Sequence, residues 1–233
     1  MLNQIKQDLK KFAVKEKIQV YQNFFKTNQG QYGEGDIFIG VTVPNTRIIA
    51  KKYKNIKLEI VNKLLLSKIH EERMLGALIL VQKYKKADNK NKEKIFNFYL
   101  QNTQNINNWD LVDLTAPQII GNYLLEKDRA SIYKLVKSKN LWEKRISIVT
   151  TFAFIKNNQF EDTLKIAEIL LNDSHDLIHK SVGWMLREVG KRDFKIEEKF
   201  LKQHYKKMPR TMLRYAIEKF DEELRQKYLK GKI

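Results

Sequence analysis

The sequence predicts an all-α protein, and two observations support this. Apolar residues recur at three- and four-residue spacing along nearly the whole chain, as in the stretch from His70 to Lys85. Only 9 glycines and 3 prolines are available for the tight turns that a sheet-based fold needs. The 233 residues are 42% hydrophobic and 11% aromatic, which excludes a disordered chain despite its charge.

The expected helices are separated by turn-forming residues. A first helix-opening signal is Val43-Pro44, because proline is tolerated in the first turn of a helix. The other breaks are expected at Asn28–Asp36, Asp88–Asn91, Asn102–Asn108, Asp128, Asn157–Gln159, Asp173–Ser174 and Met208–Pro209. These breaks predict about a dozen helices of ordinary length joined by short connections.

A period in the mid-thirties runs through the helices. Arg73, Trp109, Arg145, Lys180 and Arg214 fall at matching positions, with spacings of 36, 36, 35 and 34 residues. A period of this length without tetratricopeptide or ankyrin signatures indicates HEAT-like helix pairs that stack on one another. We therefore expect a single domain over residues 1–233, a curved α-solenoid of HEAT-like antiparallel helix pairs, with these five side chains in one column on its concave face.

The net charge of +18 is concentrated toward the two ends of the chain. Residues 1–70 carry +8, residues 71–190 carry +3 and residues 191–233 carry +7. A concave surface with basic flanks suits duplex DNA, where phosphates supply most of the affinity. Lys-rich helical surfaces also simply keep proteins soluble, so the charge alone leaves both interpretations open. The column of basic residues favours DNA.

Several classes of protein are excluded by what the chain lacks. Without cysteine there is no disulfide framework, thiolate metal site or cysteine nucleophile, which fits a reducing cytoplasm. No apolar run approaches the roughly 20 residues of a membrane span. The opening residues MLNQIKQDLKKF are amphipathic, unlike a signal peptide, and no helix has the paired basic and apolar faces of a membrane-surface helix. We expect a soluble, monomeric, cytoplasmic protein that acts at the nucleoid.

The segment from Asn107 to Asp113 carries the strongest functional signal. Trp109 and Asp113 stand four residues apart and share a helix face. Trp184 occupies the position equivalent to Asp113 two repeats later, and Arg145 lies in the repeat between them. A tryptophan in a helical repeat is more often a core residue, and an aspartate early in a helix also stabilises the helix dipole. The joint placement of two tryptophans and one aspartate on the expected concave face favours a site.

These residues resemble the DNA alkylation repair enzymes built of HEAT-like repeats, the alkylpurine DNA glycosylases of the AlkD type. The resemblance is strongest from about Asn108 to Arg192. Three segments carry it: Trp-Asp-x-Val-Asp from Trp109 to Asp113, Trp-x-x-Arg from Trp142 to Arg145, and Gly-Trp-x-Leu-Arg-Glu from Gly183 to Glu188. The resemblance implies hydrolysis of the N-glycosidic bond of N3- or N7-alkylated purines in duplex DNA, without a metal or other cofactor.

The resemblance also implies roles for individual residues. Trp109, Asp113 and Trp184 would form the cleft that holds the deoxyribose and phosphate backbone of the lesion, and Arg145 would contact a phosphate. The column of basic residues adds three further expected DNA contacts, at Arg73, Lys180 and Arg214.

The expected chemistry suits these residue types. An alkylated purine is cationic and leaves as a neutral base, so no general acid is needed. The deoxyribose gains oxocarbenium character, which an ionised Asp113 stabilises while it orients a water molecule. The faces of Trp109 and Trp184 also stabilise a nearby cation. Since no lysine nucleophile is required, we expect a monofunctional hydrolase.

Two other functions are compatible with the sequence. A glycine-bearing loop from Gly30 to Asp36 stands where the resemblance implies a helix that grips DNA. A non-catalytic module that binds damaged or branched DNA is therefore an alternative, and a solenoid that binds an acidic peptide is a less favoured one. The loop itself is interpreted as a connector, because it lacks the Gly-Lys-Ser/Thr of a phosphate cradle.

Other signals are weaker. His175 and His179 are four residues apart, but no third ligand stands nearby, so no metal site is expected. The run from Lys83 to Lys94 holds six lysines and two acids and is interpreted mainly as a solvated edge, with phosphate contact as the alternative. No nucleophile-elbow motif supports Ser/His/Asp catalysis.

Overall fold

The computed structural model describes residues 1–233 and confirms the all-α prediction. Its one β feature is an isolated parallel bridge between Ile37 and Ile69. None of its helices combines the length and the apolar character needed to cross a membrane. The structure divides into two compact units, Met1–Thr115 and Ala116–Ile233, so the expected single domain stays a prediction.

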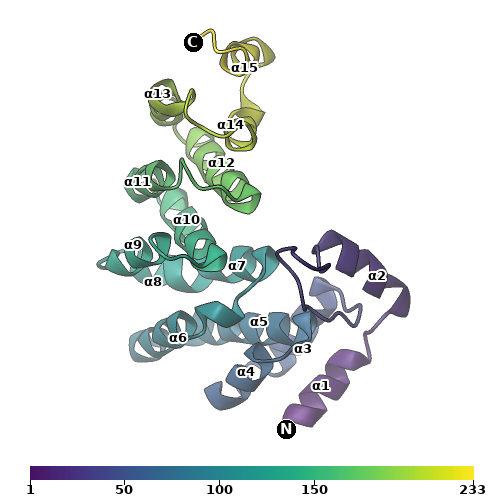
Figure 1. Ribbon diagram of the computed structural model, residues 1–233. Helices are drawn as coiled ribbons and strands as arrows, with labels where there is room; N and C mark the ends of the chain where they lie inside the picture. The colour runs from purple at the N-terminus through teal and green to yellow at the C-terminus, as the bar shows by residue number, and fades with distance from the viewer. The chain divides into compact units, whose positions relative to one another are not determined.

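The first unit is organised around one central helix. Its elements are α1 (Leu2–Lys10), α2 (Lys15–Phe24), α3 (Val43–Lys52), α4 (Leu58–Leu65), α5 (His70–Lys86), α6 (Asn89–Gln101), the 3₁₀ turn η1 (Thr103–Asn105) and α7 (Trp109–Ala116), which ends at the unit boundary. Helix α5 packs against α3, α4 and α6 (Figure 1) and is buried over every residue from His70 to Val81. The part of α5 from His70 to Val81 is therefore enclosed by the rest of the unit.

Two predicted helix starts are confirmed by their caps. The Thr42 hydroxyl accepts a hydrogen bond from the Asn45 backbone N–H at 3.5 Å, and Pro44 lies in the first turn of α3. The Asp88 carboxylate accepts one from the Asn91 N–H at 2.8 Å at the start of α6. These two breaks are therefore set by side-chain capping.

The second unit is a stack of helices in two layers. Its elements are the π-helical turn η2 (Pro117–Gly121), α8 (Asn122–Leu124), α9 (Ala130–Val136), α10 (Leu141–Lys156), α11 (Glu161–Ile169), α12 (Asp176–Gly190), α13 (Phe194–His204), α14 (Arg210–Ala216), the 3₁₀ turn η3 (Ile217–Lys219) and α15 (Glu222–Leu229). Helix α10 contacts α12 and α12 contacts α14 in one layer, while α9 contacts α11 in the other (Figure 1). This alternation is the helix-pair stacking that the period predicted.

Gly183 explains the glycine in the Gly-Trp segment of α12. A Cβ atom at this position would lie 2.4 Å from the Met212 carbonyl oxygen and 2.5 Å from the Tyr215 Cβ. Only glycine lets α12 and α14 approach so closely. Helix packing therefore explains why this position is a glycine.

A buried carboxyl group lies between α12 and α13. Glu197 is only 2% exposed, and its Oε1 atom has no hydrogen-bond partner. Its other oxygen occupies the space over Gly190, where a Cβ atom would come within 1.6 Å of it. Burial raises the pKa of Glu197 to about 8, against the opposing positive charge of Arg187. The native state therefore holds this group protonated at neutral pH.

Replacing Glu197 by glutamine is expected to stabilise the protein at neutral pH. Because the carboxyl group binds its proton more tightly in the folded state, its contribution to stability is complete below pH 4.5 and is lost as the pH rises toward 8. The neutral amide of the same shape removes this loss, so we expect E197Q to gain ~1–3 kcal/mol at pH 7. Urea unfolding at pH 5, 6, 7 and 8 measures the effect.

Glu198→Gln is the matched control, since Glu198 pairs with Lys202 at 3.0 Å at the partly exposed surface. An E197Q protein whose stability changes with pH as the wild type does would contradict the assignment.

Candidate functional site

The first unit contains a pocket of about 380 Å³ with mostly aromatic and aliphatic walls. We call it the aromatic pocket. Its side chains come from α2, the segment that follows the glycine loop, α3, α5 and α7. They are Tyr21, Phe24, Phe25, Phe38, Val41, Val43, Thr46, His70, Glu71, Met74, Trp109, Asp110, Asp113 and Leu114. This volume is within the range of small-molecule sites.

Four rings form a continuous stack along one side of the aromatic pocket. Trp109 stacks on Phe25 with ring centroids 5.3 Å apart and an interplanar angle of 20°. Phe25 stacks on Phe38 at 5.1 Å and 16°, and Phe38 stacks on His70 at 4.6 Å and 25°. Phe24 contacts Trp109 edge-on at 5.6 Å. Trp109 thus packs directly on the rings of Phe24 and Phe25, and Phe38 and His70 extend the stack beyond them.

The α7 helix brings an aromatic plane and a carboxylate to the same pocket. Trp109 is its first residue and Asp113 lies one turn further on, and both are partly exposed. Leu111 and Val112 are fully buried and anchor the opposite face. The carboxylate lies near Tyr99, whose pKa is raised by burial and further by the negative charge of Asp113.

A buried charge network holds the start of α7 against α5. The imidazole of His70 is 2% exposed, with Nε2 2.9 Å from Asp110 Oδ2 and Nδ1 3.2 Å from Asp36 Oδ2. Arg73 donates to Asp36 Oδ1 at 2.6 Å, and the Asn108 amide donates to Oδ2 at 3.3 Å. One network therefore joins the end of the glycine loop, the start of α5 and the start of α7.

The network keeps His70 protonated. Burial alone would lower its pKa, but the Asp110 charge and the hydrogen bonds to both carboxylates outweigh burial and raise the pKa to about 9. Burial acts to raise the pKa of Asp36, yet the hydrogen bond from His70 and the charge of Arg73 leave it lowered. The pocket therefore has a cationic imidazolium at the end of its ring stack, paired with two carboxylates.

Glu71 shapes the wall of the pocket through the backbone. Its carboxylate is 3% exposed and accepts hydrogen bonds from the N–H groups of Ile39 at 3.1 Å, Gly40 at 2.8 Å and Val41 at 3.2 Å. Burial raises the pKa of Glu71, although these backbone donors act in the opposite direction. Gly40 has a φ of +80°, and a Cβ there would lie 2.0 Å from the Val14 carbonyl oxygen, so the turn requires glycine.

Comparison with known proteins identifies the family. The family model described as DNA alkylation repair enzyme matches residues 5–220. The chain belongs to the DNA alkylation repair enzyme family. The fold is similar to the solved structure of a predicted DNA alkylation repair enzyme from Enterococcus faecalis, with a TM-score of 0.68 and 13% identity over 90% of this chain and 97% of that chain. No curated protein sequence matches significantly.

In this family member, the structure brings together two of the three residues predicted to be catalytic. Trp109 and Asp113 line the same pocket in the first unit. Trp184 belongs to the second unit, where it is partly exposed on α12 and its ring lies 5.7 Å from that of Phe152. The sequence-based roles of these residues in catalysis stay predictions.

The expected column of surface cations is interrupted at two positions. Arg73 is 4% exposed and is held by Asp36 and the Ser67 carbonyl oxygen. Arg145 is 5% exposed and donates to the Leu177 carbonyl oxygen at 2.6 Å. Buried arginines need internal partners, so these two guanidinium groups serve the packing of their units.

The other two cations of the column lie at the surface. Arg214 is exposed on α14, and Lys180 is partly exposed on α12 and lies 2.6 Å from the Asp176 carboxylate. Their role as DNA contacts stays a prediction.

Three residues of the site were not predicted from the sequence: Asp36, His70 and Asp110. Asp36 ends the glycine loop that was interpreted as a connector, and its contacts with His70 and Arg73 make that loop part of the site. The available signal was a His-Glu-Glu-Arg run directly before the apolar stretch from Met74 to Val81. Ionisable side chains at the start of a buried helix need charged or polar partners from other parts of the chain.

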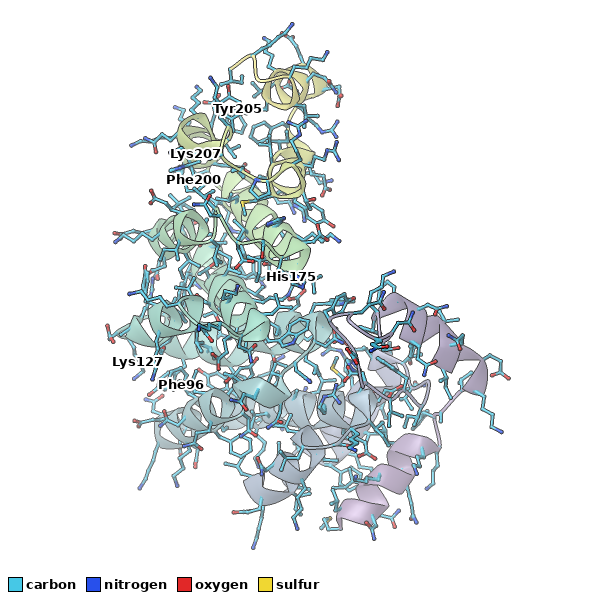
Figure 2. The ribbon with its side chains drawn as sticks, in the orientation of Figure 1. Phe96, Lys127, His175, Phe200, Tyr205 and Lys207 are labelled. Atoms are coloured by element: carbon cyan, nitrogen blue, oxygen red, sulfur yellow. The ribbon has the colours of Figure 1, made fainter.

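The two histidines considered as metal ligands have backbone partners. His175, labelled in Figure 2, caps α12, where its Nδ1 accepts a hydrogen bond from the Leu177 N–H at 3.1 Å. His179 Nε2 lies 2.5 Å from the Asp173 carbonyl oxygen. One histidine thus caps the helix, and the other contacts the backbone of the turn before it.

Proposed function

We propose that this protein is a monofunctional DNA glycosylase that hydrolyses the N-glycosidic bond of N3- or N7-alkylated, cationic purines in duplex DNA. One observation carries the proposal: Trp109 and Asp113 lie one turn apart on α7 and both border the aromatic pocket. Membership of the DNA alkylation repair enzyme family supports DNA as the partner.

The charges around the aromatic pocket suit a cationic ligand. The positive charges of His70 and Arg73 are matched by the carboxylates of Asp36 and Asp110 within one network. Asp113 adds a further carboxylate to the wall of the pocket that Trp109 also lines. A flat cation at this place gains both a carboxylate and a ring quadrupole.

The reaction needs few groups from the protein. The C1′–N bond breaks, and its electron pair neutralises the alkylated purine, which leaves without a proton. Water adds to C1′ and releases a proton, while Asp113 stabilises the positive sugar and orients the water. Trp109 holds the sugar edge through its ring, and we propose a similar aromatic contribution to activity for Trp184. Surface cations such as Lys180 and Arg214 bind phosphates.

Release of free base from methylated DNA tests the proposal. A duplex treated with a methylating agent is incubated with excess protein, and released 7-methylguanine and 3-methyladenine are measured by chromatography. We expect release by the wild type, release reduced at least about tenfold by Trp109→Ala, and no strand cleavage at the abasic product. Untreated duplex is the control for release without methylation.

Absence of released methylated base at high protein concentration would overturn the proposal that the protein is a glycosylase. Tight, salt-sensitive DNA binding in that case would identify a non-catalytic DNA-binding module.

A further inference from the structure

A second pocket of the first unit is lined by cations and contains no acidic side chain. It has a volume of about 440 Å³, and we call it the lysine pocket. Its lining residues are Lys54, Asn55, Leu58, Gln82, Lys83, Lys86, Ala87, Asn91, Lys94 and Ile95. They come from the α3–α4 connection and the start of α4, the end of α5 and the first turns of α6. The aromatic pocket is lined by the opposite end of α5. The sixteen residue steps from His70 to Lys86 correspond to about 24 Å along the helix axis.

The positive charges of the lysine pocket are not neutralised within the protein. No carboxylate forms an ion pair with Lys54, Lys83, Lys86 or Lys94, although many other lysines of the chain have such a partner. The ammonium group of Lys86 lies close enough to Lys54 to lower the pKa of Lys54. Bringing like charges together costs free energy unless an anion joins them.

Lys83 holds the backbone of the α3–α4 connection at one side of the pocket. Its ammonium donates to the Ile56 carbonyl oxygen at 2.8 Å and the Lys54 carbonyl oxygen at 3.4 Å, which ties the α3–α4 connection to α5. Burial lowers the pKa of this group. The other three lysines surround a site whose backbone is already held in place.

The start of α6 adds neutral donors and positive potential. Asn91 lines the pocket in the first turn of this 13-residue helix, where the helix dipole is positive. The one acid at this helix start, Asp88, is exposed and accepts the hydrogen bond of the Asn91 N–H. The amides of Asn55 and Gln82 offer further donors to an oxyanion.

We propose that the lysine pocket binds the phosphodiester backbone of nucleic acid, as a contact separate from the aromatic pocket. Lysine binds phosphate as a point charge, and several lysines around one open pocket suit successive phosphates of a strand. The DNA alkylation repair family implies DNA as a partner. An acidic peptide would also need hydrogen-bond acceptors for its backbone N–H groups, and the only lining side chains that offer them are the three amides. The proposal does not depend on base excision.

The salt dependence of DNA binding tests this site. The variant K54Q/K86Q/K94Q leaves Lys83 in place, because Lys83 holds the backbone. With an undamaged labelled duplex, the slope of log affinity against log salt concentration is measured by fluorescence anisotropy. Each lost phosphate contact reduces the magnitude of the slope by about 0.9, so we expect a reduction of about 2–3 and weaker binding at low salt.

Two further variants show whether a change in slope comes from the lysine pocket itself, from a general loss of positive charge, or from a loss of folding. K134Q/K137Q/K139Q removes the same charge from exposed positions of the second unit and should change the slope by less than one contact, about 0.9. K54R/K86R/K94R keeps the charge and should retain the wild-type slope. A lysine-pocket variant that matches the wild-type slope, or that changes it no more than the control does, would overturn the proposal.

Inorganic pyrophosphate distinguishes a strand from a free anion. It should compete with the duplex for the wild type only weakly, at millimolar concentration. The wild type could instead bind pyrophosphate tightly while K54Q/K86Q/K94Q keeps the wild-type DNA slope. That result would assign the pocket to small phosphates and overturn the proposed contact with nucleic acid. Binding of an acidic peptide that is lost in the variant, again with unchanged DNA binding, would do the same.

Discussion

Replacing Asp113 by asparagine is expected to slow release of methylated purines from duplex DNA by about 10²–10³-fold. The amide keeps the shape of the side chain but cannot stabilise a positive sugar by charge. Because Asp113 lines the aromatic pocket beside Trp109, its negative charge lies where a cationic group would be bound. Single-turnover base release from methylated duplex, with protein in excess, measures the chemical step.

The same variant should bind DNA at least as tightly as the wild type, since one negative charge has been removed from a site that approaches phosphates. A loss of rate without a loss of affinity is the signature of an interaction made in the transition state. Asp128→Asn, at an exposed position of the second unit, is the matched control and should leave the rate unchanged. Wild-type rates for D113N would remove Asp113 from the mechanism.

Replacing His70 by leucine is expected to destabilise the protein by about 3–5 kcal/mol at pH 7, since breaking a buried ion pair leaves a charge without its partner. Asp110 would lose its contact with Nε2 at 2.9 Å, and Asp36 would lose its contact with Nδ1 at 3.2 Å. Urea unfolding monitored by circular dichroism gives the free energy. His204→Leu, which removes a partly exposed histidine whose ring contacts that of Phe200 at a tilt, should cost less than ~1 kcal/mol.

The pH dependence separates charge from packing. The pKa of His70 is raised from 6.5 to about 9 on folding, so its contribution to stability is complete below pH 6.5 and is lost as the pH rises through 9. Over this window the wild type should lose about 1.4 kcal/mol per pH unit through this group, and H70L should lack that part of the slope. Identical slopes for the two proteins would show that His70 is neutral when folded.

The fold could be predicted from the sequence because local patterns determine it. The apolar spacing, the capping residues Thr42 and Asp88, and the repeat period each act within one or two helices. The helical hairpins of the second unit follow from the same periodicity. Trp109 and Asp113 were found because their spacing alone places them on one face of α7.

The charged network could not be predicted, because its members are far apart in the sequence. His70 is 34 residues from Asp36 and 40 residues from Asp110. A helix that begins with His-Glu-Glu-Arg looks like a solvated helix end, yet His70, Glu71 and Arg73 are all buried here. Each is compensated by a partner that only the tertiary structure supplies. The same long-range pairing, with Asp36, explains why Arg73 is buried although it was expected at the surface.

The wall formed by α2 has a consequence for the kinetics of the site. This helix has no fully buried residue, and Val20 and Phe24 are each 60% exposed. It contacts the unit through the rings of Tyr21 and Phe24 and through Phe25 just after its end. Elements with little buried apolar surface open at low free-energy cost while the rest of a protein stays folded. The amides of α2 should therefore exchange faster than those of α5. Opening of this helix would remove Tyr21 and Phe24 from the wall of the aromatic pocket and so shorten the residence time of a bound ligand.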